Sequence, residues 1–400
     1  MQPSSNNCPS HRQSAAARRG RFARAGRAVC LAAIASASLL AACSSKDVRR
    51  EPTPLVDFKQ VLDVRQAWNA SVGKAGRYLF QPIVVGEAVY AAGANGSVGK
   101  FDAASGRVIW RVKLDADLSA GVGSDGHLSA VGAINGDVIV LGEDGKQLWR
   151  GNVSGEILSA PLVGNGLVVV RTVDGRITAF NAQTGEQQWQ FRNRAVPLNL
   201  RTTQGMIFAG QSAVLAGFPG GSLAAISVQT GDPFWQTPVS FPRGVTEVER
   251  INDVSGAPAL VGRLTCAVTF QGKLGCFDVE SGRPAWEQSF SSYAGLALNE
   301  QMVVAADDWS VLNAYEAFSG KRRWQNDQLK NRQLGTPAII GRAVAVGDYK
   351  GFVHFLSGDD GTLIARMKTD GSAIFAQPVV AGQTLIVQTR DGDLYAFQPQ

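Results

Sequence analysis

The chain has 400 residues, and 45 % of them are hydrophobic, which is enough to bury a large core and excludes global disorder. The formal net charge of +6 comes from residues 1–42, which contain six arginines and no acid and leave 33 basic and 33 acidic residues in the remainder. Net charge therefore gives no reason to expect an anionic ligand surface, and we predict no nucleic-acid partner.

Residues 1–42 are predicted to be a lipoprotein signal peptide. An arginine-rich region ends at Arg27, and the apolar stretch 28–42 that follows is shorter than the ~20 residues needed to span a bilayer. It ends in Leu40-Ala41-Ala42-Cys43, which resembles a bacterial lipobox, so Cys43 is the predicted site of lipidation. The alternative is an ordinary secretory signal with a coincidental cysteine. Ser44 after the cysteine favours the outer membrane.

Residues 43–60 are polar, contain Pro52 and Pro54, and are predicted to form a flexible tether from the lipidated Cys43. No later segment has 18 or more consecutive apolar residues. We therefore expect residues 61–398 to form a soluble body that is lipid-anchored at the periplasmic face of the outer membrane.

The body repeats with a mean period of about 42 residues, which is the strongest structural signal in the chain. Each copy opens at a glycine, or at Ser310 in one copy, turns at a second glycine and ends on a tryptophan. Ala365 stands in for the tryptophan of the seventh copy, and the eighth copy, which opens at Gly392, lacks that half. The missing half lies near the other end, around Trp68. The predicted blade-docking tryptophans are Trp68, Trp110, Trp149, Trp189, Trp235, Trp286 and Trp324.

Apolar residues occupy both faces of each predicted strand. The second and fifth residues after an opening, for example Val98 and Phe101, are apolar throughout, and odd and even offsets point to opposite faces. Both faces must therefore be buried between neighbouring sheets. Strand-turn-strand units at this period predict an all-β, eight-bladed β-propeller with four-stranded blades. The split eighth copy predicts that an N-terminal strand closes the last blade, which removes free sheet edges.

Residues typical of catalysis or metal binding are scarce in the body. His127 and His354 lie in different repeats without partners at metal spacing, and no hydrolase, zincin or nucleotide-binding motif occurs in a credible context. We therefore predict no catalytic residues, no metal, no cofactor and no enzymatic activity. Cys266 and Cys276 flank a predicted hairpin tip, and they are either a disulfide or small buried fillers.

The repeat pattern Ala-x-(Asp/Asn)-x-x-(Ser/Thr)-Gly-x-x-x-Trp resembles the tryptophan-docking repeat of pyrroloquinoline-quinone dehydrogenases. Those enzymes are longer and carry an adjacent cysteine pair, calcium ligands and a catalytic aspartate in their central funnel. This chain has no adjacent cysteines and about 340 residues of propeller. A quinone-dependent periplasmic dehydrogenase is kept as an alternative function, because a shared fold does not carry function.

A larger part of the mature chain resembles the BamB family, lipoproteins of the outer-membrane β-barrel assembly (BAM) machinery. The similarity covers the lipobox, the tether, the repeats and segments outside them, including 196–201, 249–254 and 347–354. The resemblance implies a non-enzymatic scaffold that binds the POTRA domains of BamA and the rest of the BAM complex. Such a scaffold supports the folding and insertion of outer-membrane proteins, and direct contact with their unfolded precursors stays open.

The two longest intervals between docking tryptophans are neighbours and contain candidate binding loops, because loops on a rigid scaffold often carry function. The first contains 196–201 (VPLNLR), and the second contains 241–244 (FPRG) and 247–253 (EVERIND). Apolar anchors beside an arginine and an acid are typical of interface hot spots. The alternative is that Leu198 and Leu200 belong to a buried first strand of a blade.

By resemblance to the BamB family, Leu198, Leu200, Arg201 and Asp253 would form the surface that docks on BamA. The family has a second acid where this chain has Ser255, which weakens the acidic half of the predicted site. A propeller that binds a different envelope protein is the remaining alternative.

Overall fold

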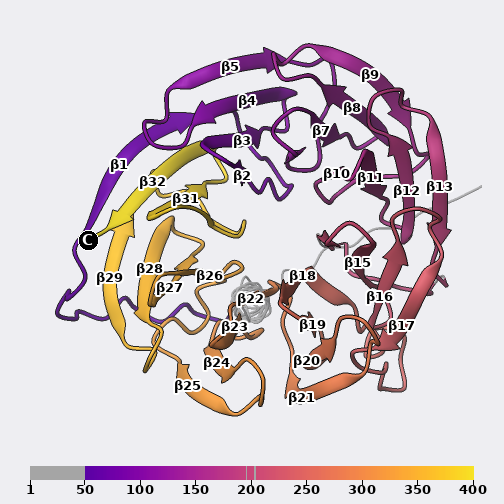
Figure 1. Cartoon of the computed structure of the whole chain (residues 1–400). Coiled ribbons are helices and arrows are strands. Elements are labelled where there is room, and N and C mark those ends of the chain that lie inside the picture. The colour runs from indigo at the N-terminus through magenta and orange to yellow at the C-terminus, as the bar shows by residue number, and fades with distance from the viewer. Residues whose placement is uncertain (1–49, 195, 202–203) are drawn as a thin grey trace, which may run out of the picture. The chain divides into compact units, whose positions relative to one another are not determined.

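A computed structural model describes residues 50–194, 196–201 and 204–400 of the chain. The predicted signal peptide and Cys43 lie outside the described residues. Within the described ranges, 32 strands form eight four-stranded sheets, which Figure 1 shows arranged as blades around a central axis. The predicted eight-bladed propeller is confirmed.

Blades 1 to 4 follow each other along the chain, and each has its strands in sequence order from the axis outward. Blade 1 comprises β2 (Ile83–Val85), β3 (Ala88–Ala92), β4 (Ser97–Asp102) and β5 (Val108–Lys113). Blade 2 comprises β6 (Gly123–Ser124), β7 (Ser129–Gly132), β8 (Asp137–Leu141) and β9 (Gln147–Asn152). Blade 3 comprises β10 (Leu162–Gly164), β11 (Leu167–Arg171), β12 (Arg176–Asn181) and β13 (Gln187–Arg192). Blade 4 comprises β14 (Met206–Ala209), β15 (Ala213–Phe218), β16 (Ser222–Ser227) and β17 (Pro233–Pro238).

Blades 5 to 7 repeat this order, and blade 8 joins the two ends of the propeller. Blade 5 comprises β18 (Val254–Val261), β19 (Leu264–Thr269), β20 (Gly272–Asp278) and β21 (Pro284–Phe290). Blade 6 comprises β22 (Leu296–Leu298), β23 (Met302–Ala306), β24 (Leu312–Glu316) and β25 (Arg322–Asn326). Blade 7 comprises β26 (Ala338–Ile340), β27 (Ala343–Gly347), β28 (Phe352–Ser357) and β29 (Leu363–Lys368). Blade 8 comprises β30 (Val379–Ala381), β31 (Thr384–Gln388), β32 (Asp393–Pro399) and β1 (Val64–Ser71).

Strand β1 closes blade 8 by pairing antiparallel with β32, from Val64 opposite Pro399 to Ser71 opposite Asp393. The predicted closure by an N-terminal strand is therefore confirmed. The apolar repeat positions also lie where both faces of a sheet are covered, since Val98 and Phe101 are fully buried on opposite faces of β4. The core is thus a series of apolar layers between neighbouring blades.

The docking tryptophans connect each blade to the next one. In the described chain, seven indole N–H groups donate to a backbone carbonyl of the following blade at 2.7–3.0 Å. The donor–acceptor pairs are Trp68–Ala103, Trp110–Glu143, Trp149–Ala182, Trp189–Val228, Trp235–Val279, Trp286–Ala317 and Trp324–Gly358. A buried indole needs a partner for its N–H, and here that partner also sets the position of the next blade.

The junction between blades 7 and 8 has Ala365 in place of a tryptophan, and the N-terminal strap (residues 52–62) packs there instead. The backbone N–H groups of Val61 and Leu62 both donate to the Ile364 carbonyl, at 3.0 and 3.2 Å. The Leu62 side chain packs on the apolar cluster that contains Ala365. In Figure 1 this indigo segment runs past β29 and β28. The structure therefore places the end of the predicted flexible tether, from Pro52 on, against the propeller.

A buried polar network holds the N-terminal half of the strap. Arg332 donates to the Thr53 carbonyl at 3.1 Å and to Asp348 at 2.8 Å. Arg366 donates to the Val56 carbonyl at 3.1 Å, and its guanidinium lies 5.0 Å from the centre of the Phe58 ring. These contacts fix the strap by backbone and side-chain atoms together. In the part of the chain that the structure describes, no helix has the length and apolar character needed to cross a membrane.

Candidate partner-binding site

The loop after β13 leaves blade 3, and its described residues 193–194 and 196–201 form neither helix nor strand; β14 begins at Met206. Leu198 is 47 % exposed, Leu200 is half-buried and Arg201 is exposed. The alternative that Leu198 and Leu200 form a buried first strand of a blade is therefore wrong. The structure instead presents an apolar residue and a cation on a loop that a rigid scaffold carries.

The buried side chain of Asp253 anchors this loop. Its carboxylate accepts hydrogen bonds from the Leu200 N–H at 2.5 Å and from the Gly220 N–H at 3.1 Å. Asp253 is fully buried, and this burial raises its pKa, although both hydrogen bonds and the charge of Arg171 act in the opposite direction. The expectation that Asp253 forms part of the docking surface is corrected here: its side chain positions the loop and does not reach solvent.

Arg171, at the end of β11, interacts with the charge of Asp253 and was missed by the sequence analysis. Burial lowers its pKa to about 9, while Asp253 acts to raise it. The guanidinium donates to the Gly217 carbonyl and to the side-chain oxygen of Gln204, and it lies 4.8 Å from the centre of the Phe218 ring. Arg171 directly follows the apolar run 167–170 in the sequence. A charged residue that continues a run of buried apolar residues is unusual, and this pattern could have identified Arg171 as a buried functional residue.

Arg201 and Ser255 complete the set of predicted site residues. Arg201 forms an ion pair with Glu156 at 2.7 Å, and both side chains stay partly exposed. Ser255, the position at which the resemblance implies a second acid, is 1 % exposed in β18 and is therefore buried. Among the predicted site residues, Leu198, Leu200 and Arg201 are the accessible ones.

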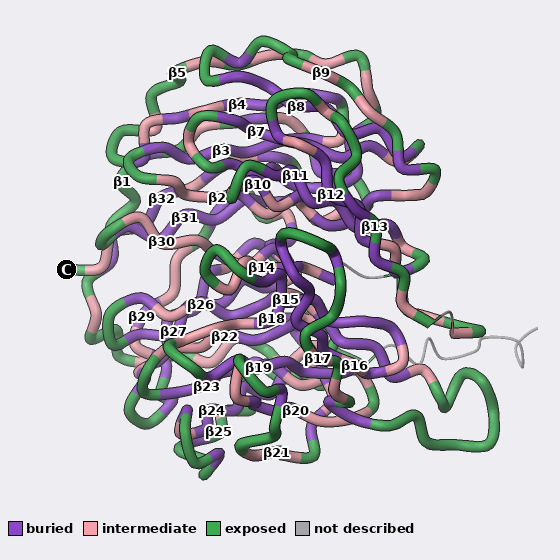
Figure 2. Tube along the Cα trace, turned by 45° about the vertical axis from the view of Figure 1, so that its right-hand side comes forward, coloured by how far each residue is buried: buried purple, intermediate pink, exposed green. Residues whose placement is uncertain are grey.

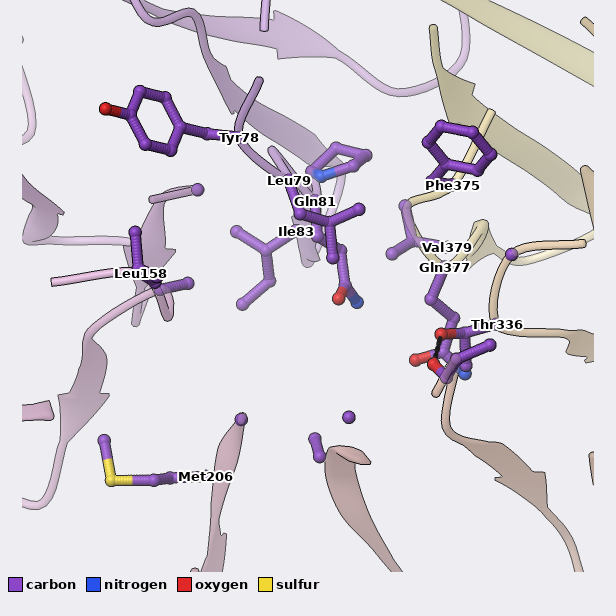
Figure 3. Close-up of a pocket in the computed structure, with 18 of the residues that line it drawn as sticks. Tyr78, Leu79, Gln81, Ile83, Leu158, Met206, Thr336, Phe375, Gln377 and Val379 are labelled. Carbon is purple, nitrogen blue, oxygen red and sulfur yellow. Dashed lines mark hydrogen bonds between the residues drawn. The ribbon is translucent and has the colours of Figure 1, made fainter. Parts of the chain in front are cut away.

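A central channel opens between the innermost strands, with a cavity volume of about 920 Å³. Every blade contributes to its wall, and Figure 3 shows Ile83, Leu158, Met206, Phe375 and Val379 around the open space. Arg201 is among the lining residues, so the loop reaches the rim of the channel.

The channel does not match the ligand set of the quinone enzymes. Its described lining contains no carboxylate, which calcium requires, and the described residues contain no group of three or more His, Cys, Asp or Glu that could hold a metal. Cys266 and Cys276 face each other on β19 and β20 and form a disulfide, so that alternative for the two cysteines is confirmed. These residues therefore do not fit a calcium-bound quinone.

His127 and His354 lie in separate blades. His127 is exposed near Glu143, while His354 is fully buried in β28 next to Asp348. Burial lowers the pKa of His354 below its ordinary value, although the Asp348 carboxylate favours the charged ring. His354 thus belongs to the network beneath the strap and not to the loop site.

The fold and the loop define a class of protein: a propeller with tryptophan-docked blades that presents a partly apolar loop. Comparison with known proteins then identifies the family. A family model described as "Outer membrane protein assembly factor BamB" matches residues 94–326 and 308–400. The chain belongs to the BamB family of outer membrane protein assembly factors.

Individual relatives agree with this assignment. The assembly factor BamB of Burkholderia pseudomallei is 67 % identical, covering 92 % of this chain and 97 % of its own, and that of Bordetella pertussis is 45 % identical, covering 94 % and 98 %. The crystal structure of BamB from Moraxella catarrhalis matches with a TM-score of 0.78 and 25 % identity over 84 % of this chain and all of that one. A quinohemoprotein alcohol dehydrogenase from Comamonas testosteroni matches with a TM-score of 0.68 and 15 % identity, covering 88 % of this chain and 81 % of its own, and shares the fold alone.

Proposed function

We propose that the chain is a non-enzymatic scaffold of the BAM complex that binds the POTRA domains of BamA and supports the folding and insertion of outer-membrane proteins. Family membership supports the assignment to outer membrane protein assembly. The observation that carries the binding site is the exposed loop with Leu198 and Arg201, which the buried Asp253 holds through the Leu200 N–H. A preordered loop loses little conformational entropy when a partner binds it.

Lipidation of Cys43 would anchor this scaffold at the periplasmic face of the outer membrane, after removal of residues 1–42. Residues 43–60 would then form the tether, of which the segment from Pro52 on lies against the propeller, and residues 61–398 would hold the propeller. Several acyl chains on one cysteine give firm anchoring, because each buried CH₂ contributes about 0.8 kcal/mol.

A quinone-dependent dehydrogenase is not favoured, because the described channel wall offers no carboxylate for calcium and the two body cysteines are bonded to each other across β19 and β20. A propeller that binds another envelope protein shares the same fold and anchor. It differs from our proposal in the partner that would be captured.

The first experiment is a pull-down of the tagged lipoprotein from mild-detergent membranes, with co-purified proteins identified by mass spectrometry. We expect BamA and its companion lipoproteins among them. Enrichment of a different envelope protein without BamA would reject the BAM assignment.

The binding site is tested with the triple variant Leu198→Ala, Leu200→Ala, Arg201→Ala. We expect its affinity for purified BamA to fall about tenfold or more, which is the size of effect that loss of a few central interface residues produces. The matched control replaces Arg107, Val108 and Ile109 by alanine, three consecutive exposed residues at the start of β5 in blade 1. Unchanged affinity in a folded triple variant would reject this loop as the site.

A further inference from the structure

The chain has eight tryptophans, and Trp309 is the one outside the docking series. It lies in the turn between β23 and β24 and is 45 % exposed. Exposed residues of the propeller lie mostly in such connections between strands (Figure 2), where small polar residues are usual. At the equivalent position the first three copies have ordinary turn residues, namely Asn95, Asn135 and Asp174.

The turn itself does not depend on the indole ring of Trp309. The Asp307 carboxylate accepts hydrogen bonds from the N–H groups of Trp309 and Val311, at 2.8 and 2.9 Å, and so closes the turn. These bonds use backbone atoms of Trp309 and no atom of its side chain. Local folding therefore gives no reason for a large aromatic side chain at this position.

A second aromatic residue, Tyr349, lies in the equivalent turn of the next blade, between β27 and β28, and therefore on the same face of the propeller. The segment 330–332, between β25 and β26, joins the two turns. The Asn331 N–H donates to the Trp309 carbonyl at 2.7 Å, and the Tyr349 N–H donates to the Arg332 carbonyl at 3.2 Å. Backbone hydrogen bonds thus fix both aromatic residues relative to each other.

Each of the two aromatic rings has a lysine beside it. The Lys330 ammonium lies 5.6 Å from the centre of the Trp309 ring, and the Lys350 ammonium lies 5.4 Å from the centre of the Tyr349 ring. Both lysines are exposed, and Tyr349 is half-buried. We call these four residues, Trp309, Lys330, Tyr349 and Lys350, the aromatic–lysine surface.

The acids near this surface are largely turned to other partners. Asp307 and Asp308 are half-buried; Asp307 closes its turn, and Asp308 accepts from the Ser291 hydroxyl. Asp348 is fully buried and paired with Arg332. Asp327 is exposed on the connection after β25, and it reduces but does not cancel the charge of the two exposed lysines.

The strap begins between the two aromatic–lysine pairs. The Thr53 N–H donates to the Lys330 carbonyl at 3.0 Å, and Arg332 donates to the Thr53 carbonyl at 3.1 Å. Lys330 lies beside Trp309, whereas the guanidinium of Arg332 lies 5.4 Å from the centre of the Tyr349 ring. The start of the strap is therefore held within this surface.

The short tether brings the membrane within reach of the same place. Pro52 is nine residues after Cys43, the predicted site of lipidation, which corresponds to at most about 30 Å of extended chain. Tryptophan and tyrosine favour the boundary between lipid and water, and lysine covers apolar surface with its stem while its ammonium meets the phosphates. Two such pairs beside the start of the strap are thus complementary to a phospholipid headgroup layer.

We infer that the aromatic–lysine surface contacts the phospholipids of the leaflet that holds the lipid anchor, with Trp309 at the depth of the headgroups. This inference rests on the proposed function, because it requires the anchor at Cys43. The contact orients the propeller with blades 6 and 7 at the membrane. The Leu198 loop, between blades 3 and 4, lies three blades away around the ring and stays available to its protein partner.

The test uses the full-length lipoprotein reconstituted into vesicles of phosphatidylethanolamine and phosphatidylglycerol whose acyl chains carry bromine. Bromine quenches tryptophan fluorescence on contact, so the difference between the wild type and Trp309→Ser reports the contact of Trp309 with lipid. We expect the wild type to be quenched and Trp309→Ser to lose that component. Trp309→Ser should also bind purified BamA like the wild type.

A charge variant and a matched control complete the design. Lys330→Glu with Lys350→Glu should lower the quenching of Trp309 about threefold or more, because basic residues near an anionic surface contribute to its attraction. The control carries Trp309→Ser together with Phe318→Trp. Phe318 is 65 % exposed in the turn between β24 and β25, on the opposite face of the same blade, so this variant should not be quenched.

The outcomes separate this inference from the proposed anchor. Equal quenching of the wild type and Trp309→Ser overturns the inference, while acyl chains on Cys43, detected by mass spectrometry, leave the anchor standing. Absence of acyl chains rejects both. Quenching of the Phe318→Trp control as strong as that of Trp309 shows lipid contact without a preferred face and overturns the inference. Weaker BamA binding by Trp309→Ser, without lipid quenching in the wild type, makes a protein the occupant and also overturns it.

Discussion

The indole ring of each docking tryptophan lies over a glycine of the following blade, and this pair sets how closely neighbouring sheets approach. A Cβ atom added to Gly231 would lie 2.7 Å from a ring carbon of Trp189, closer than real Cβ contacts allow. The ring cannot move aside freely, because its N–H donates to the Val228 carbonyl at 2.7 Å. A glycine is therefore required at position 231 for two reasons, the close packing against Trp189 and the φ of +78°.

Gly231→Ala is predicted to lower the free energy of unfolding by about 2–4 kcal/mol, since it combines left-handed strain with overpacking against the indole. Gly210→Ala is the matched control in the same blade, because Gly210 has a φ of +63° and open space around its added Cβ. That variant should lose about 1 kcal/mol. Urea unfolding at pH 7 measures both. Equal losses would show that the tryptophan does not restrict this glycine.

The site residues show where a sequence pattern is informative and where it is not. An unusually long interval between tryptophans predicted a loop that contains Leu198, Leu200 and Arg201, and resemblance to the BamB family predicted their role. The structure places the three residues outside the strands, as such an interval suggests. The burial of Asp253 could not be predicted, because its carboxylate contacts residues 53 and 33 positions away. Arg171 was missed for the same reason, since its partners come from blade 4 and the loop before it.

At the scale of elements, the N-terminal strap replaces the docking tryptophan that blade 7 lacks. The sequence shows the substitution by Ala365 but does not indicate what fills the position. Prolines and polar residues made residues 52–60 resemble a free tether, whereas tertiary contacts with Arg332 and Arg366 order them. Local composition could not predict contacts that span about 280 and 310 residues of sequence.

Phe58→Ser is predicted to release the strap and to accelerate tryptic cleavage after Lys59 about tenfold. The substitution removes the partly buried ring that packs on the blade 6–7 cluster and faces Arg366, and a loss of this size is typical of a half-buried aromatic side chain. Limited proteolysis followed by mass spectrometry measures the rate. Phe318→Ser, an exposed phenylalanine far along the chain, is the control. Equal cleavage rates in the two variants would show that the ring does not hold the strap.

At the scale of the whole molecule, the period of about 42 residues predicted the number of blades, their four strands and the closure by β1, because each depends on a repeating local pattern. What the repeat cannot predict are departures from it. His354 stands where other copies have a smaller residue such as Thr178 or Ala224, and its buried partner Asp348 comes from the turn before β28. Such a polar network is specific to one blade and leaves no periodic signal.

We expect this network to make the stability of the propeller dependent on pH. His354 Nε2 lies 3.0 Å from the Asp348 carboxylate, while its Nδ1 accepts a hydrogen bond from Arg366 at 3.3 Å, an arrangement that requires a neutral ring. Burial, with the charges of Arg366 and Arg332, lowers the pKa of His354 against the attraction of Asp348. Burial would raise the pKa of Asp348, but hydrogen bonds from His354, the Phe352 N–H and Arg332 lower it below its ordinary value.

We predict that the free energy of unfolding falls as the pH drops from 7 to 5.5. Below the ordinary histidine pKa of about 6.5 the unfolded chain takes up a proton at His354 that the folded chain does not, at a slope of at most about 1.4 kcal/mol per pH unit. The contribution of Asp348 is lost only at lower pH, as its carboxylate is protonated. His354→Gln keeps a hydrogen-bond donor for Asp348 but does not titrate, so its urea midpoint should change less over this range. A variant with the wild-type pH dependence would place the titrating group elsewhere.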